Sequence, residues 1–190
     1  MNNDLYQIIT TIGEGDFREK GSKFLGFAVP MESIEYLDVF LSALRSSHPK
    51  ARHFCYAYRL SANDWRANDD GEPRHSAGTP ILRQIQSREL FHTAVVVVRY
   101  FGGTKLGVSG LIRAYETAAA IALDAAKTVS IYPSVVQKYR LNYPAYNRLM
   151  QLLPQYDAEV THQELSEDVL VVIRVRESKA LELALMMEKI

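Results

Sequence analysis

Residues 95–115, VVVVRYFGGTKLGVSGLIRAY, join an apolar run to a helical pattern and decide the fold of the chain around them. Residues 95–98 are four consecutive valines, which is typical of a strand buried on both faces. We therefore expect this strand at the centre of its sheet. From Leu111 the apolar side chains recur with helical spacing as far as Ala126, which predicts a long alanine-rich helix beginning near Ser109.

The connection between strand and helix is rich in glycine, with four glycines in the nine residues 102–110. Glycine permits positive φ angles and close backbone approach, and the first turn of a helix leaves N–H groups without internal partners. Such a helix start attracts anions, and Arg99, Lys105 and Arg113 flank it. The pattern indicates either a phosphate or carboxylate site or a tight connection whose basic side chains are only solvated.

Composition narrows the classes of protein to consider. A hydrophobic content of 47% in 190 residues indicates a packed chain with room for one ordinary domain and a small one. The 22 basic and 22 acidic residues cancel, so any nucleic-acid contact would depend on a local patch. The single cysteine, Cys55, excludes an internal disulfide and a multi-cysteine zinc site. With no targeting or membrane-spanning pattern, we expect a cytoplasmic protein.

The N-terminal part of the chain alternates strand and helix patterns. Residues 5–12 and 23–29 read as antiparallel strands of one sheet, separated by the turn-rich residues 13–16. Ser33 is predicted to cap a helix that ends at the polar run 46–49.

Residues 53–60, HFCYAYRL, alternate so that His53, Cys55 and Arg59 share one face of a strand. A histidine and a cysteine two residues apart can share a metal ion or act as base and nucleophile, but both need further groups from elsewhere. We favour a small buried thiol beside a hydrogen-bonded imidazole. Arg59 adds anion binding as a third interpretation of this face.

Residues 61–78, SANDWRANDDGEPRHSAG, form the longest segment without hydrophobic periodicity, and such loops are usually mobile or functional. Asp69, Asp70 and Glu72 indicate either a Mg²⁺ or Ca²⁺ site or a solvated acidic turn, although their spacing does not match a calcium loop. Thr79, followed by proline, predicts the cap of the next helix. Two helix starts, near Thr79 and Ser109, would then face a common groove.

A second domain follows a linker at residues 131–134, which divides the chain into domains 1–133 and 134–190. Its predicted elements are a strand at 135–143, a helix at 144–153, a hairpin of 156–165 with 169–176, and a last helix capped by Ser178. The order βαββα is that of a ferredoxin-like domain that lacks its final strand.

Several spaced motifs closely resemble, in order, those of the IMPACT family in its bacterial YigZ branch. They are SKF at 22–24, HFCYAYR at 53–59, DGEP at 70–73, AGTP at 77–80, VRYFGG at 98–103, KLG at 105–107 and LIRAY at 111–115. One departure is Arg74-His75-Ser76, which replaces a small, less charged run.

The resemblance implies an α+β protein of two domains. The N-terminal domain would be an α/β sandwich similar to the second domain of the fifth small-subunit ribosomal protein, with a rare left-handed βαβ crossover. The C-terminal domain would be ferredoxin-like and similar to the last domain of elongation factor G. Eukaryotic members of the family resemble regulators of translation initiation that compete for the activator of an amino-acid-starvation kinase.

We therefore expect a translation-linked regulatory or binding protein that contacts RNA or a ribosome-associated partner through a basic, glycine-lined groove, without a membrane. No catalytic residue, metal ligand or cofactor is assigned. The expected anion- or nucleic-acid-binding residues are Arg59, Arg99, Gly102, Gly103, Lys105, Gly107, Ser109, Gly110 and Arg113, with His53, Asp70, Glu72 and Thr79 in support.

Two other classes stay open. The first is an enzyme acting on a phosphorylated small molecule or nucleotide, because residues 106–110, LGVSG, loosely resemble the phosphate loops of galactokinase and homoserine kinase types. They lack the Gly-Lys-Ser/Thr ending of a P-loop. The second is a protein-interaction adaptor whose motifs serve only the fold, with Glu72 and Arg99 as a structural pair. The oligomeric state is not indicated by the sequence.

Overall fold

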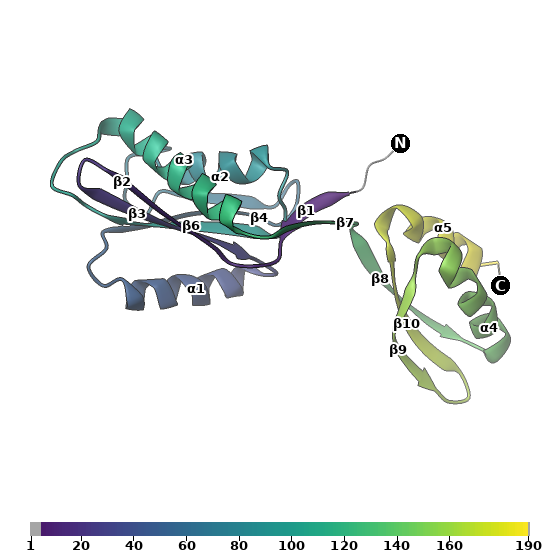
Figure 1. Ribbon diagram of the computed structural model, residues 1–190. Helices are drawn as coiled ribbons and strands as arrows, with labels where there is room; N and C mark the ends of the chain where they lie inside the picture. The colour runs from purple at the N-terminus through teal and green to yellow at the C-terminus, as the bar shows by residue number, and fades with distance from the viewer. Residues whose placement is uncertain (1–4, 190) are drawn as a thin grey trace. The chain divides into compact units, whose positions relative to one another are not determined.

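The computed structural model describes residues 5–189 and divides the chain into two compact units (Figure 1). One unit is Tyr6–Ser130, and the other contains the chain from Ile131 onward. Among residues 5–189, no helix combines the length and the apolarity that crossing a bilayer requires.

The first unit is built on a five-stranded sheet in which every neighbouring pair is antiparallel. Its strands, in spatial order, are β2 (Gly13–Glu19), β3 (Ser22–Pro30), β6 (Thr93–Tyr100), β4 (His53–Arg59) and β5 (Trp65–Asn68). The valine run lies in β6, which is central and buried on both faces as its sequence predicts.

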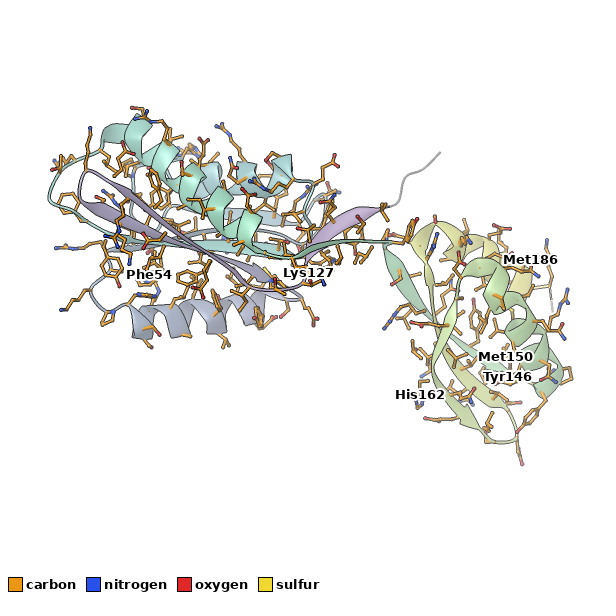
Figure 2. The ribbon with its side chains drawn as sticks, viewed as in Figure 1. Phe54, Lys127, Tyr146, Met150, His162 and Met186 are labelled. Carbon is orange, nitrogen blue, oxygen red and sulfur yellow. The ribbon has the colours of Figure 1, made fainter. Side chains whose placement is uncertain are left out.

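Helices cover both faces of this sheet (Figure 1). Helix α1 (Ile34–Ser47) covers one face, and α2 (Gly78–Ser87) with α3 (Gly107–Ala125) covers the other. The predicted alternation of β4 is confirmed, because Phe54 packs on the α1 side (Figure 2). Cys55 belongs to the core on the α2 and α3 side. Ser33 also caps α1 as expected, since its Oγ accepts the Tyr36 N–H at 3.4 Å.

The start of the chain differs from expectation. Strand β1 (Tyr6–Ile9) pairs with β7 (Thr128–Ile131) in a separate two-stranded sheet. The predicted turn at 13–16 is instead part of β2. Its glycines serve helix packing, because a Cβ at Gly13 would lie 2.1 Å from the Ala122 carbonyl oxygen and one at Gly15 only 2.9 Å from the Ala122 nitrogen.

Strand β5 was not predicted, because four residues at the edge of a sheet are too short to show a period. It pairs with β4, Trp65 opposite Arg59, and so gives regular structure to part of the long loop. Helix α3 begins at Gly107, two residues before the predicted start at Ser109.

The second unit has the predicted βαββα order. Its elements are β8 (Ser134–Leu141), α4 (Tyr143–Leu152), the 3-10 helix η1 (Leu153–Tyr156), β9 (Glu159–Leu165), β10 (Val169–Arg176) and α5 (Glu177–Met187). The sheet order is β8-β10-β9, and both helices pack on one face of it. Ser178 is not a cap as predicted: α5 begins at Glu177, directly after β10, and Arg176 stands at the cap position without a side-chain hydrogen bond.

Candidate functional site

The start of α2 is occupied by a carboxylate of the chain itself. Asp69 accepts the backbone N–H groups of His75 at 2.9 Å, Ala77 at 3.0 Å and Gly78 at 2.8 Å. Thr79 is therefore not the cap that the sequence predicts. It lies in the first turn, where its Oγ1 is 3.1 Å from His75 Nδ1. Asp69 thus takes the position at this helix start that an external anion would otherwise occupy.

Asp70 fastens the same loop to the start of β4. Its Oδ2 accepts the Phe54 N–H at 2.6 Å, its backbone oxygen lies 2.8 Å from His53 Nδ1, and Arg45 pairs with its Oδ1 at 3.2 Å. The protein itself thus satisfies this carboxylate. Among residues 5–189, no group of three or more His, Cys, Asp or Glu side chains has a metal-binding arrangement.

Glu72 is a buried carboxylate that joins the loop to the sheet and to α3. It forms an ion pair with the Arg99 guanidinium and accepts the Tyr115 hydroxyl at 2.8 Å, and His53 Nε2 lies 3.9 Å away. Both side chains of the ion pair are nearly inaccessible, at 4% exposure for Glu72 and 6% for Arg99. Arg99, predicted as a ligand-binding cation, is therefore hidden and neutralised by Glu72.

Cys55 is a buried thiol rather than a nucleophile. Its Sγ lies 3.0 Å from the Asp69 carbonyl oxygen and 3.3 Å from the Tyr115 hydroxyl oxygen. Burial raises the pKa of the Cys55 thiol well above its ordinary value and does the same to the pKa of Tyr115. Because nucleophilic cysteines need a thiolate, this environment supports the interpretation of a buried thiol beside a hydrogen-bonded imidazole.

The start of α3 differs from the start of α2 in its capping. In the described chain no side chain caps it, and its first turn contains no acidic residue. Gly107, Val108 and Ser109 are exposed, as is Lys105 just before them. Arg113 lies one turn further on with 73% of its side chain exposed, and it forms a long ion pair with Glu19, at 3.8 Å.

The glycines of the connecting loop have different roles. Gly102 packs on the β2–β3 turn, where a Cβ would fall 1.8 Å from the Gly21 carbonyl carbon, and its N–H donates to Ser22 Oγ at 3.1 Å. Gly103 and Gly107 have positive φ angles of 87° and 72° and open space around them, whereas Gly110 is buried. The loop is thus fixed at its first glycine and exposed beyond it.

Arg59 does not join the cations of this loop. The β4–β6 register places His53 opposite Arg99 and Arg59 opposite Thr93, at the two ends of the ladder. The Arg59 guanidinium instead lies over the Phe91 ring, 3.9 Å from its centroid. Of the four cations expected in one groove, the structure leaves Lys105 and Arg113 exposed beside the α3 start.

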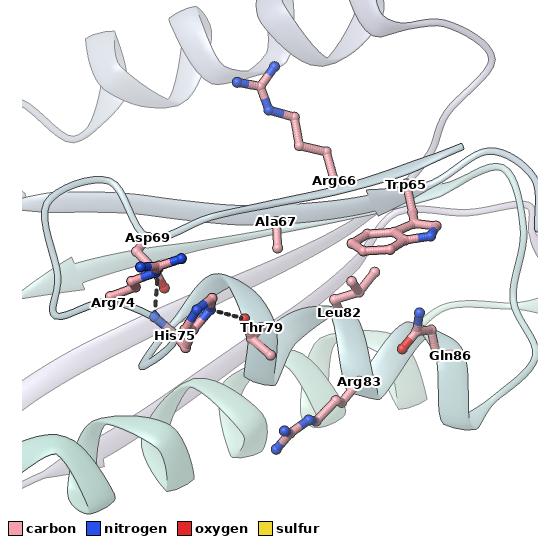
Figure 3. A pocket seen from close by; sticks show the side chains of 10 residues that line it. All are labelled: Trp65, Arg66, Ala67, Asp69, Arg74, His75, Thr79, Leu82, Arg83 and Gln86. Atoms are coloured by element: carbon pink, nitrogen blue, oxygen red, sulfur yellow. Dashed lines mark hydrogen bonds between the residues drawn. The ribbon is translucent and has the colours of Figure 1, made fainter. Parts of the chain in front are cut away.

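The sequence interpretation missed a pocket between β5 and α2, of about 610 Å³ (Figure 3). Trp65, Arg74, His75 and Arg83 are among the side chains that line it. The available signal was the chain's single tryptophan inside a charged, aperiodic segment.

The family of the Impact N-terminal domain matches residues 20–123. An IMPACT family member from Thermus thermophilus is 41% identical over 154 residues, covering 81% of this chain and 84% of its own. Escherichia coli YigZ is 30% identical over 167 residues, covering 86% and 82%.

Solved structures give a similar result. A crystal structure described as that of an hypothetical protein has a TM-score of 0.73 at 27% identity, covering 97% of this chain and 92% of its own. The two-domain translational regulator Yih1 aligns with 62% of this chain and 50% of its own at 26% identity, with a TM-score of 0.39 that is too low to support a structural argument. With the family match spanning more than half of its residues and relatives aligned over four fifths of it, this chain belongs to the IMPACT family.

Proposed function

We propose that this protein is a translation-linked binding protein that contacts RNA, or a ribosome-associated partner, through the start of α3. Its membership in the IMPACT family supports the link to translation, because the resemblance implies such a role for eukaryotic members. The contact surface consists of the exposed residues Gly107, Val108 and Ser109 with the side chains of Lys105 and Arg113.

The observation that carries this proposal is the uncapped, acid-free first turn of a 19-residue helix. A helix start holds roughly half a positive charge on its free amides, and Lys105 and Arg113 add side-chain charge on either side. A phosphate group would accept hydrogen bonds from the free amides and would pair with the side-chain charges. Phosphate contacts of this kind give affinity that falls with salt and carries no sequence information.

Three aromatic residues of the sheet and its glycine-rich loop, Tyr58, Tyr100 and Phe101, differ in their accessibility. Tyr58 is buried at 5% exposure, and the Tyr100 hydroxyl is engaged by His48 Nδ1 at 2.8 Å. Phe101, at the beginning of the loop, is 47% exposed. Of these three aromatic residues, Phe101 is thus the one best placed to add a base contact to the phosphate contacts.

The test is RNA binding by fluorescence anisotropy, using labelled single-stranded and hairpin RNA at two salt concentrations. We expect Lys105→Ala/Arg113→Ala to raise Kd about tenfold and to reduce the slope of log K against log salt by roughly 1.5, as for the loss of two phosphate contacts. Parallel ribosome co-sedimentation detects a ribosome-associated partner. Equal RNA affinity and equal ribosome binding of wild type and variant would contradict the proposal.

A matched control removes the same two residue types elsewhere. Lys138→Ala/Arg140→Ala takes one exposed lysine and one exposed arginine from β8 in the second unit. We expect it to bind RNA nearly as tightly as wild type. An equal loss in both double variants would show that net charge, rather than the α3 start, sets the affinity.

A further inference from the structure

The pocket between β5 and α2 shares no residue with the α3 start. Its floor is apolar, with Ala67 from β5 and Leu82 from α2, while Arg74, His75 and Arg83 supply positively charged or titratable groups (Figure 3). Its volume of about 610 Å³ lies within the range of roughly 300 to 1,000 Å³ that is usual for sites of small organic molecules.

Trp65 gives the pocket an exposed aromatic wall. Ala57, the ladder partner of Ala67, belongs to the core under α2 and α3, so Trp65, two residues before Ala67, faces α2 as well. Arg66 is also among the lining residues, but its side chain points to the opposite side of the strand (Figure 3). Half of the Trp65 surface is accessible, an amount of exposed indole that a stacked ring would cover.

Two arginines at the pocket lack an acidic partner. Both Arg74 and Arg83 are exposed, and within residues 5–189 neither guanidinium forms an ion pair or a hydrogen bond. Asp69 is the carboxylate in the lining, and it is engaged by three backbone N–H groups. The pocket therefore keeps an excess of positive charge that no acidic side chain of the described residues neutralises.

The loop that carries Arg74 is held in place. His75 has a left-handed backbone with a φ of 63°, its N–H donates to Asp69, and its ring bonds Thr79. Arg83 follows Thr79 by four residues and so lies on the same side of α2. The backbone positions of Arg74 and Arg83 are therefore fixed before a ligand binds, which lowers the conformational cost of binding.

We propose that this pocket binds a nucleoside phosphate. The base stacks on Trp65, with Gln86 from α2 close to it (Figure 3). The phosphate is bound by Arg74 and Arg83, which both line the pocket. Guanidinium groups suit this role because their planar donors match phosphate oxygens. The same chemistry is presented by a free mononucleotide and by a nucleotide within single-stranded RNA.

Trp65 is the only tryptophan of the chain, so its fluorescence reports on this pocket. The full chain is titrated with AMP, CMP, GMP and UMP, with adenosine, with inorganic phosphate and with a short single-stranded RNA. We expect quenching by nucleotides and a much weaker response to adenosine or phosphate alone, because each lacks one of the two contacts. A response to RNA without one to mononucleotides assigns the site to RNA, and the reverse assigns it to the free nucleotide.

Arg74→Ala/Arg83→Ala should raise the Kd for the nucleotide at least tenfold, with an unchanged melting curve because both side chains are exposed. Lys105→Ala/Arg113→Ala is the matched control and should keep wild-type nucleotide affinity, which separates this site from the α3 start. The proposal is overturned if neither millimolar nucleotide nor RNA changes Trp65 fluorescence, if inorganic phosphate alone gives the full response, or if both double variants bind as wild type does.

Discussion

Helices α2 and α3 lie on the same face of the five-stranded sheet, but their N-terminal ends differ. A side chain of the protein caps the start of α2, and none of the described residues caps the start of α3. At α2 the Asp69 carboxylate takes three backbone N–H groups, whereas at α3 no side chain of the described residues caps the helix. The protein can therefore neutralise a helix start with its own side chains. Where it does not, the amides stay accessible to something else, and exposed cations stand beside them.

The loops that lead into the two helices differ in the same way. The acidic loop before α2 resembles a metal site in sequence, but each of its three carboxylates binds a partner within the protein. Asp69 accepts hydrogen bonds at the start of α2, and Asp70 binds β4 and Arg45. Glu72 binds Arg99 and Tyr115. The glycine-rich loop before α3 carries no carboxylate at all. The acidic loop is a structural clamp, and the glycine-rich loop is the one with unused polar groups.

The largest effect is expected from Glu72→Ala, which breaks the clamp at its centre. Leaving Arg99 buried without a counter-ion should cost about 3 to 5 kcal/mol in the free energy of unfolding. Urea unfolding measures this loss. Glu72→Gln, which can still accept the Tyr115 hydroxyl, should cost less. A loss below about 1 kcal/mol in the alanine variant would mean that Arg99 finds another partner and that the clamp is not essential.

An intermediate effect is expected from Asp69→Ala, which makes the start of α2 resemble that of α3. Three N–H groups lose their acceptor, and the unfolding free energy should fall by about 2 kcal/mol. Sulfate should then stabilise the variant more than wild type, because the vacated start becomes an anion site. Asp38→Ala, on the exposed side of α1, is the charge-matched control. If sulfate raises the midpoints of all three proteins equally, the comparison between the two helix starts fails.

The smallest effect is expected from Ser109→Asp, which makes the start of α3 resemble that of α2. A carboxylate in the first turn should stabilise the helix by about 0.5 kcal/mol, visible as a small rise in Tm. The same change should weaken RNA binding, because it places negative charge where we propose a phosphate. Ser109→Asn separates charge from shape. Unchanged RNA affinity together with the rise in Tm would remove the α3 start from the proposed function.

Local patterns predicted much of the fold and little of the site. The valine run identified the central strand β6, and Ser33 marked the start of α1. The alternation of residues 53–59 assigned the two faces of β4. In contrast, Gly13 and Gly15 were interpreted as a turn, because sequence cannot distinguish a glycine needed for a positive φ angle from one needed to admit a helix. Short β5 carried too few residues to be recognised.

The sequence by itself determined most of the order of strands and helices, the strand that is buried on both faces and the presence of two glycine-containing helix starts, because these depend on neighbours within a few residues. Only the tertiary structure decided that Asp69 closes one start, that Glu72 conceals Arg99, and that Arg59 lies at the far end of its strand. These outcomes depend on contacts between segments distant along the chain. Such contacts determine which charges are neutralised and which remain free to bind.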